Sequence, residues 1–247
     1  MVLIIAHRGY NAIHPENTML SFQAAIDAGA TGIELDVHLS SDGEVVVMHD
    51  CKVDRTTNGS GTIRQLSYHD YIEKLDAGRG ERVPLLGEVM DICKKHDIFL
   101  NIEVKATGLV EAILNLVGDR GDRNRTMISS FNHGILRSFN ELGNLSWLAA
   151  LVPTSPGAFI RNVFTRLFGS KQDNMMRKAI DAGANAINPF FGTCTKSFFH
   201  ECKDHGLEVF PWTVDQTRRA DRLVTWGASG IITNDPGKMI RNFGSSH

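Results

Sequence analysis

Eight short apolar runs, separated by longer segments with the hydrophobic spacing of helices, limit what this chain can fold into. Continuous apolar runs of this length, each followed by a helix, are typical of parallel strands that are buried on both faces. Eight of them predict an α/β fold, a (β/α)8 TIM barrel, formed as a single domain over residues 1–247. The expected strands are Leu3–Ala6, Gly32–Val37, Phe99–Val104, Thr126–Ser130, Trp147–Leu151, Ala186–Asn188, Val209–Thr213 and Gly230–Thr233.

Turn residues support this alternation of helices and strands. In three segments a glycine ends a helix, a small residue follows and an isoleucine begins the next strand: Gly29–Ile33, Gly183–Ile187 and Gly227–Ile231. Glycine suits the left-handed position after a helix because it has no Cβ. We therefore expect a helix over Thr18–Ala28, with Asn17 as its N-cap and Gly29 just beyond its end.

The segment after the second expected strand breaks the alternation. Asp42-Gly43 lies between two strand-like runs and predicts a two-residue hairpin turn. In that register Asp36 would face His49, which brings His49 back to the barrel mouth. The glycine-containing residues 50–84 that follow are expected to form a small insertion over the mouth.

The composition is that of a globular protein without a bulk charge of either sign. Hydrophobic residues make up 42% and charged residues 22% of the chain, and the net charge is −2. This balance argues against nucleic acid or an anionic membrane as a bulk partner. The four cysteines have no zinc-like spacing and do not indicate a disulfide framework. The start of the chain does not resemble a signal peptide and no apolar run reaches about 18–20 residues, so we expect a cytoplasmic protein.

Acidic side chains occur at strand ends, where active sites gather in α/β barrels. Glu34 and Asp36 are two positions apart in one strand, so they point to the same side, and Glu103 joins them from the next strand. Carboxylates this close repel each other unless a proton or a cation compensates. Three oxygen donors without a cysteine suit Mg²⁺ or Ca²⁺. The alternative is a salt-bridge network with Arg8 and Lys105.

Two histidines are expected at the same mouth, His7 at the end of the first strand and His49 on the returning hairpin. Imidazole titrates near neutral pH, so such a pair beside a metal can act as general acid and general base. Arg8 and Lys105 add positive charge, because arginine can bind two phosphate oxygens and lysine acts as a point charge. Together these residue types favour phosphoryl transfer.

An ordered series of short motifs extends from residue 7 to residue 236. They are His7-Arg8-Gly9, Pro15-Glu16-Asn17-Thr18, Glu34-Leu35-Asp36-Val37, Asp42-Gly43, His49-Asp50, Arg55-Thr56-Thr57-Asn58-Gly59, Pro84-Leu85-Leu86, Asn101-Ile102-Glu103-Val104-Lys105, Trp212-Thr213-Val214 and Thr233-Asn234-Asp235-Pro236. In this order they resemble the glycerophosphodiester phosphodiesterase family, whose members are barrels with a small insertion after strand two. The resemblance implies hydrolysis of a small-molecule glycerophosphodiester to sn-glycerol 3-phosphate and an alcohol such as choline or ethanolamine.

The same resemblance implies a role for each residue of the site. One divalent cation, Mg²⁺ or Ca²⁺, would be held by Glu34, Asp36 and Glu103. The general acid and general base would be His7 and His49, in either order. The substrate phosphate would lie against Arg8 and Lys105.

Three further features each have more than one interpretation. Glu16 either supports the site from behind its ligands or is an acidic residue at the start of a helix. Trp212 either contacts the substrate or packs at the barrel mouth. Residues 157–169 place apolar side chains opposite arginines at helical spacing. This segment is a helix packed on the barrel, a homodimer contact, or a lid that touches a lipid chain or membrane surface.

Other functions remain open at this point. Residues 157–169 suggest lysophospholipase D-type cleavage of lysophospholipids at the same site. An enolase-type proton abstraction with Lys105 as the base would not need the pair His7 and His49. A phosphate binder without catalysis would not need the acid–base and metal positions.

Overall fold

The fold is a parallel barrel in the part of the chain that the computed structural model describes, residues 2–143, 146–153 and 170–244. The barrel strands are β1 (Leu3–His7), β2 (Gly32–Leu39), β4 (Phe99–Val104), β5 (Thr126–Ser130), β6 (Trp147–Val152), β7 (Ala186–Pro189), β8 (Glu208–Val209) and β9 (Gly230–Thr233). They pair in parallel in the order β8-β7-β6-β5-β4-β2-β1-β9. The predicted TIM-barrel fold is confirmed, and the residues of β4, β5 and β9 are those expected.

The barrel closes between β8 and β9. Backbone hydrogen bonds cross this seam from Ser229 N to Val209 O at 2.9 Å, and from Ile232 N to Pro211 O at 3.0 Å. A third runs from Val214 N to Ile232 O at 2.9 Å. The predicted strand Val209–Thr213 is wrong in its length, because regular pairing covers only β8. Pro211 has no N–H to donate to a ladder, so the extended chain beyond β8 is held by separate bonds.

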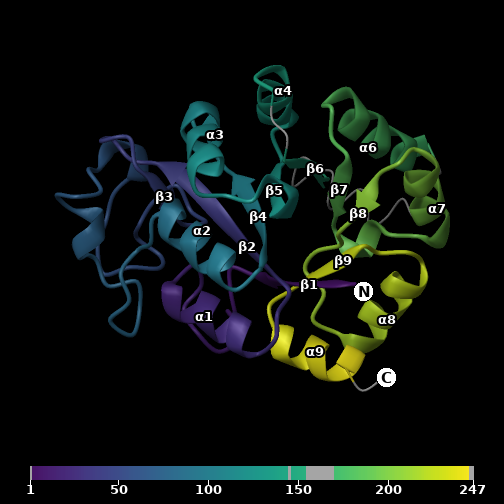
Figure 1. Cartoon of the computed structure of the whole chain (residues 1–247), viewed down its shortest axis with the longest axis horizontal. Helices are drawn as coiled ribbons and strands as arrows, with labels where there is room; N and C mark the ends of the chain where they lie inside the picture. Colours follow the sequence, from purple (N-terminus) through teal and green to yellow (C-terminus); the bar gives the residue numbers. More distant parts are fainter. Residues whose placement is uncertain (1, 144–145, 154–169, 245–247) are drawn as a thin grey trace.

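Helices surround the ring of strands (Figure 1). They are α1 (Met19–Asp27), α2 (Leu86–Lys95), α3 (Val110–Asp119), α4 (His133–Glu141), α6 (Ser170–Asp181), α7 (Lys196–Asp204), α8 (Thr217–Thr225) and α9 (Pro236–Gly244). The main hydrophobic core lies between helices and sheet, where Ile33, Leu35 and Val37 of β2 are fully buried. Alternate residues of β2 therefore face the barrel interior. Among the described residues, none of the helices has the length and apolar character that crossing a membrane requires.

The start of α1 differs from the expectation. Thr18, not Asn17, is the N-cap, because its backbone is extended and its Oγ1 accepts a hydrogen bond from Ser21 N at 3.2 Å. Ser21 Oγ accepts one from Thr18 N in return. Asn17 takes the left-handed conformation at φ 55° and is free to point its side chain elsewhere. The expected glycine after the helix is confirmed, since Gly29 has φ 88°.

The hairpin register also differs from the expectation, by one residue. β3 (Val45–Val47) pairs with β2 so that Val37 faces Val47. The Met48 N donates to Asp36 O at 2.9 Å, so Asp36 faces Met48 and not His49. Ser41 joins the predicted turn residues, so the turn contains three residues, 41–43, and Gly43 takes its left-handed last position at φ 89°. His49 lies one position beyond the paired residues.

The insertion between β3 and α2 projects from the side of β3 (Figure 1). It contains the 3-10 helices η1 (Ile63–Gln65) and η2 (Ile72–Lys74). Its buried residues, which include Val53, Ile63 and Tyr68, form a hydrophobic cluster separate from the main core. The barrel loops carry two more single turns, η3 (Arg123–Arg125) and η4 (Phe191–Thr193).

Candidate active site

Three carboxylates converge inside the barrel near the carboxyl ends of its strands. Glu34 and Asp36 lie on β2, and Asp36 is paired with Glu103 of β4. Each residue offers an oxygen, and these three oxygens lie within 4.8 Å of one another. The three residues are buried, with exposed fractions of 3% for Glu34, 0% for Asp36 and 7% for Glu103. The residue spacing along β2 and the β2–β4 register together produce this cluster.

Burial and mutual repulsion make three charges at this place costly. Burial raises the pKa of Glu34 well above its usual range, and the neighbouring charges of Asp36 and Glu103 raise it further. Burial, followed by the charge of Asp36, raises the pKa of Glu103 to about 7. Burial opposes ionisation of Asp36 too, but the adjacent Lys105 and Arg8 outweigh it and lower its pKa. The charge of Asp36 is therefore stabilised by the protein itself, whereas Glu34 and Glu103 are compensated only by a proton or by another positive charge.

The basic side chains compensate only part of this charge. Lys105 Nζ lies 2.9 Å from Asp36 Oδ1 and also contacts Glu103 Oε1, while Arg8 Nε lies 3.3 Å from Asp36 Oδ2. Asp36 Oδ1 is buried, and among the described residues the Lys105 ammonium is the group that contacts it. Three buried carboxylates that each bring an oxygen within 4.8 Å of the others fit a hard divalent cation such as Mg²⁺ or Ca²⁺. In a salt-bridge network alone, Arg8 and Lys105 face three carboxylates, so at least one carboxyl group would have to keep its proton.

Asn17 is a site residue that the sequence did not reveal. Its side chain Nδ2 donates to Asp36 Oδ2 at 2.9 Å. The left-handed backbone of Asn17 turns this amide away from the helix start and toward the barrel interior. A contact across 19 residues between a loop and a strand has no local sequence signal, although Asn17 belongs to one of the motifs.

His7 and Arg8 enter the site from the end of β1. His7 Nε2 lies 3.9 Å from Glu34 Oε2, and Arg8 N donates to the same oxygen at 3.0 Å. Burial, followed by the charge of Arg8, lowers the pKa of His7 to about 4. Arg8 Nη1 donates to Glu16 Oε1 at 3.0 Å, so Glu16 supports the site from behind Arg8. Glu16 lies before α1, and the first turn of this helix contains no acidic residue.

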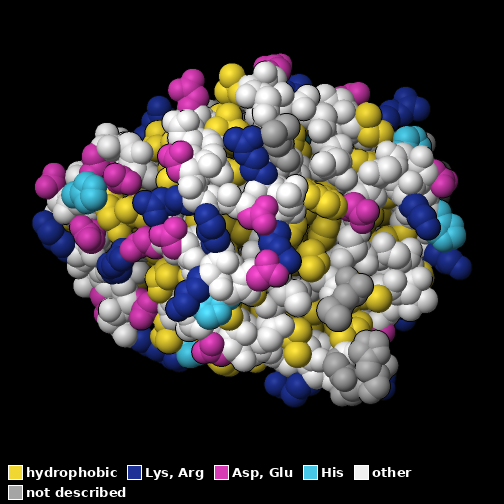
Figure 2. Space-filling view, in the orientation of Figure 1, with side chains coloured by type: hydrophobic (Ala, Val, Ile, Leu, Met, Phe, Trp, Pro, Cys, Tyr) yellow, Lys and Arg dark blue, Asp and Glu magenta, His cyan; other side chains and the backbone are white. Residues whose placement is uncertain are grey.

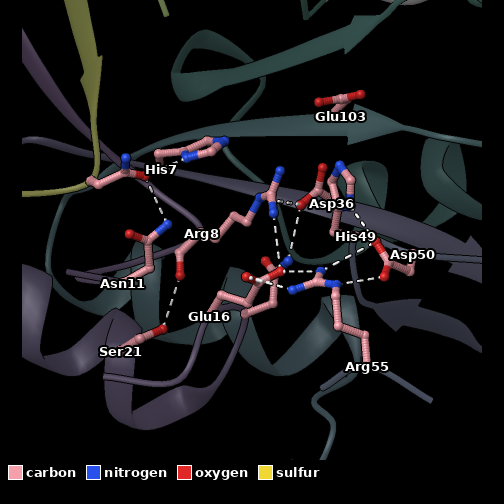
Figure 3. A network of polar contacts seen from close by, with 12 residues as sticks. His7, Arg8, Asn11, Glu16, Ser21, Asp36, His49, Asp50, Arg55 and Glu103 are labelled. Carbon is pink, nitrogen blue, oxygen red and sulfur yellow. Dashed lines mark hydrogen bonds and ion pairs between the residues drawn. The ribbon is translucent and has the colours of Figure 1, made fainter. Parts of the chain in front are cut away.

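His49 is held by a chain of polar contacts that reaches the insertion (Figure 3). Its Nδ1 lies 2.6 Å from Asp50 Oδ1, and Arg55 Nε donates to Asp50 Oδ2 at 2.6 Å. The Arg55 guanidinium also donates to both oxygens of Glu16, at 2.7 and 3.1 Å. Burial lowers the pKa of His49, although the nearby charge of Asp36 opposes this. Glu16 thus contacts both Arg8, next to His7, and Arg55, which holds Asp50 against His49. The sequence alone indicated no role for Asp50 or Arg55.

Aromatic side chains border the charged residues at the mouth. Trp212 is half-buried, and its Nε1 donates to Asn188 O at 2.8 Å. Its ring packs edge-on against Phe131 at 5.6 Å and against Phe190 at 5.7 Å between centroids. These residues follow β5 and β7, so they lie at the same end of the barrel as the carboxylates. Figure 2 shows basic and acidic side chains side by side across this face, with hydrophobic side chains bordering them.

A parallel barrel with acidic, basic and imidazole side chains gathered at one end of its strands defines a TIM-barrel enzyme. The model of the glycerophosphoryl diester phosphodiesterase family matches residues 7–238. The chain belongs to this family, and the resemblance seen in its motifs is confirmed. It is an enzyme of the phosphoric diester hydrolase class, which excludes the non-catalytic binder and the proton-abstracting barrel.

Relatives and solved structures are similar to this chain over nearly its full length. A glycerophosphodiester phosphodiesterase of Caldanaerobacter subterraneus is 35% identical over 255 residues, which cover 96% of each chain. Human lysophospholipase D is 26% identical over 97% of this chain and 86% of that one. The structure of an Oleispira antarctica phosphodiesterase, solved with its product sn-glycerol 3-phosphate, has a TM-score of 0.84 and 24% identity. It covers 98% of this chain and 96% of that chain, and at this identity it supports the fold.

Proposed function

We propose that this enzyme hydrolyses glycerophosphodiesters to sn-glycerol 3-phosphate and an alcohol, with the help of one divalent cation. The observation that carries the proposal is the buried cluster of Glu34, Asp36 and Glu103, with His7 and His49 held beside it. The charges of Asp36, Arg8 and Lys105 act on both imidazoles, so all these groups share one electrostatic environment. The full-length similarity to a glycerophosphodiester phosphodiesterase supports the choice of substrate.

The cation would be held by Glu34, Asp36 and Glu103, whose oxygens suit either Mg²⁺ or Ca²⁺. When bound, it would polarise the phosphate and offset negative charge that develops on the phosphate oxygens. Arg8 and Lys105 are proposed to bind the same phosphate. Both basic side chains lie beside Asp36, so they would flank a phosphate that a cation holds at the three carboxylates.

The histidines are proposed as the acid–base pair. Each has its Nδ1 within hydrogen-bond distance of an oxygen, on Asn234 for His7 and on Asp50 for His49. Each ring is thereby held so that its other nitrogen can meet the substrate. One would take the proton of the glycerol 2-hydroxyl as it attacks phosphorus, and the other would protonate the departing alcohol. Water would then open the resulting cyclic phosphate to give sn-glycerol 3-phosphate.

Trp212 is proposed to contact the substrate on the side of the departing alcohol. It stands with Phe131 and Phe190 at the mouth, apart from the acidic cluster on β2 and β4. An aromatic wall of this kind offers apolar area and a negative ring face to a group such as choline. Glu16 is proposed to hold Arg8 and Arg55 rather than touch substrate.

Lysophospholipase D-type cleavage at the same site is the alternative. The half-buried Trp212 and Phe131 could receive part of an acyl chain, and human lysophospholipase D is similar over most of this chain. The segment 157–169, which suggested lipid contact, lies outside the described residues. Lipid contact, a homodimer, the absence of a nucleic-acid partner and the cytoplasmic location stay predictions.

A panel of diesters tests the proposal. Enzyme treated with a chelator and then supplied with Mg²⁺ or Ca²⁺ is given glycerophosphocholine, glycerophosphoethanolamine and lysophosphatidylcholine, and release of sn-glycerol 3-phosphate or lysophosphatidic acid is measured. We expect turnover of the soluble diesters that disappears on chelation and returns with a divalent cation. The variants His7→Ala and His49→Ala should each lose at least ~100-fold in kcat. Activity on the lysolipid alone would replace the proposal by its alternative, and full activity in chelator would refute the cation.

A further inference from the structure

One contact of His7 comes from the opposite end of the chain. His7 ends β1, and its Nδ1 lies 2.7 Å from Oδ1 of Asn234, which follows β9. Asn234 belongs to the motif Thr233-Asn234-Asp235-Pro236, which the proposed acid–base and cation roles do not include. Asn11 Nδ2 donates to the same Oδ1 at 2.9 Å. Figure 3 shows His7 and Asn11 on the side of the site away from Arg55.

The orientation of the Asn234 amide is decided by Asp215. Asn234 Nδ2 lies 2.7 Å from Asp215 Oδ2, and Asn234 N donates to Asp215 Oδ1 at 2.8 Å. Thr233 Oγ1 donates to the same Oδ1 at 3.0 Å. A carboxylate only accepts hydrogen bonds, so the amide group that faces it is the NH₂. The amide oxygen therefore faces His7, and Asn11 Nδ2 can donate to the same oxygen.

The amide oxygen determines where the proton of His7 lies. An amide oxygen can only accept, so the hydrogen bond at 2.7 Å requires the proton on Nδ1 of His7. Nε2, which lies 3.9 Å from Glu34 Oε2, is then the nitrogen that exchanges a proton with the substrate. We propose that Asn234, oriented by Asp215, is a positioning residue that holds His7 in its Nδ1–H tautomer. The catalytic consequence of this inference rests on the proposed function, whereas the tautomer of His7 does not depend on it.

A purely structural role for Asn234 makes different predictions. Asn234 joins the end of β9 to the segment after β8 through Asp215, near the seam that closes the barrel. If only this link mattered, loss of the side chain would lower the melting temperature, and the tautomer of His7 would not change. If the amide sets the tautomer, the proton on His7 moves when the acceptor is removed.

The first test reads the tautomer directly. Long-range ¹H–¹⁵N spectra of the Mg²⁺-loaded, ¹⁵N-histidine-labelled enzyme distinguish a proton on Nδ1 from one on Nε2. The chain has ten histidines, and the spectrum of the His7→Gln variant assigns the signal that disappears to His7. We expect the Nδ1–H pattern for His7 in the wild-type enzyme. An Nε2–H pattern there would overturn the inference, whether or not the enzyme cleaves glycerophosphodiesters.

Variants then connect the tautomer to turnover. Asn234→Ala should convert His7 to an Nε2–H or mixed pattern and lower kcat by about 10–100-fold, with KM within about threefold of wild type. The matched control is Asn242→Ala, which breaks a similar asparagine–aspartate bond of 2.7 Å to Asp221 on the outer helices. It should leave tautomer and kcat unchanged. An Asn234→Ala enzyme that keeps the Nδ1–H pattern and its kcat would overturn the proposal.

An exchange of the two partners provides a rescue. In the double variant Asp215→Asn with Asn234→Asp, the amide lies at position 215 and the carboxylate faces His7. The hydrogen-bond donors and acceptors remain matched, so we expect the Nδ1–H pattern and a kcat at least ~10-fold above that of Asn234→Ala. The single variant Asn234→Asp sets two carboxylates against each other and should not show this recovery. A double variant no better than Asn234→Ala would contradict the proposed role.

Discussion

Asp36 of β2 and Glu103 of β4 occupy directly paired positions, and the ammonium of Lys105 contacts both carboxylates. Side chains at paired positions of adjacent strands point to the same face, so two acidic residues meet inside the barrel. Glu34, two residues before Asp36, brings a third carboxylate to the same cluster. Removing one of these carboxylate charges is therefore a direct test of cation binding.

Loss of one carboxylate should weaken the binding of the cation. Glu103→Gln keeps the shape of the side chain but removes one of three charged ligands. We expect the rise in melting temperature on addition of Mg²⁺ or Ca²⁺ to shrink, because stabilisation by a ligand depends on its affinity. Differential scanning fluorimetry over a range of cation concentrations measures this. Glu111→Gln, at an exposed position of α3, is the control and should behave as wild type. Equal shifts in wild type and Glu103→Gln would remove Glu103 from the ligand set.

The support of His49 should affect turnover more than substrate binding. Asp50→Asn removes the carboxylate at Nδ1 of His49, and we expect kcat to fall about 10–100-fold with little change in KM. Arg55→Lys should cause a smaller loss, because an ammonium cannot bridge Asp50 and Glu16 as the guanidinium does. Steady-state kinetics on glycerophosphocholine checks both. Arg64→Lys, an exposed change in the same insertion, should leave kcat and KM as they are. A change in KM alone for Asp50→Asn would point to substrate contact instead.

Gly9 should be intolerant of any side chain. Its φ is 80°, and an added Cβ would lie 2.7 Å from the backbone carbonyl carbon of Ser21. Gly9→Ala therefore combines left-handed strain with a clash against the backbone of α1, and we expect a loss of about 2–4 kcal/mol in the free energy of unfolding. Gly43→Ala is the matched control, since Gly43 has φ 89° but no neighbour within 4 Å. That variant should lose only about 1 kcal/mol. Urea unfolding measures both, and similar losses for the two would show that the clash is relieved.

The hairpin turn should make stability depend on acid pH. Asp42 accepts hydrogen bonds from Ser40 Oγ, Ser67 Oγ and the backbone of Tyr68 and His69, which ties the turn to the insertion. Burial opposes ionisation, but these hydrogen bonds together outweigh it and lower the pKa of Asp42. A carboxylate whose pKa is lower in the folded state stabilises the protein at neutral pH, and this stabilisation is lost as the pH falls below about 4.

Asp42→Asn tests this pH dependence. We expect the variant to be less stable than wild type by about 1 kcal/mol at pH 7, with the difference shrinking as the pH is lowered below about 4. Urea unfolding of both proteins across this range isolates the contribution of Asp42, because the other titrating groups are common to both. A difference that stayed constant with pH would mean that ionisation of Asp42 contributes nothing to the free energy of unfolding.

Much of the fold was predictable because its signals are local. The apolar runs that became β4, β5 and β9 match the sequence expectation at both ends, since buried parallel strands require continuous apolar residues. The spacing of Glu34 and Asp36 placed both on one face of β2 without any knowledge of the barrel. The expected left-handed glycine after α1 followed in the same way from chain geometry alone.

Errors and omissions occurred where residues distant in sequence compete for the same place. The hairpin register shifted by one residue because Ser41 joined Asp42 and Gly43 in the turn, and His49 is nevertheless held at the site through Asp50 and Arg55. The cap of α1 moved to Thr18, which left Asn17 to bind Asp36. Neither outcome can be predicted from a local pattern, because each depends on which hydrogen-bond partner lies nearby after folding.

By its residue types and their periodicity, the sequence alone determined a parallel barrel with carboxylates and histidines at the carboxyl ends of its strands. Only the tertiary structure decided that Asn234 meets His7 across 227 residues, and that Glu16 joins Arg8 to Arg55. The physical reason is that strand and turn preferences act between neighbours along the chain. The orientation of a polar side chain is decided by the donors and acceptors that folding places around it.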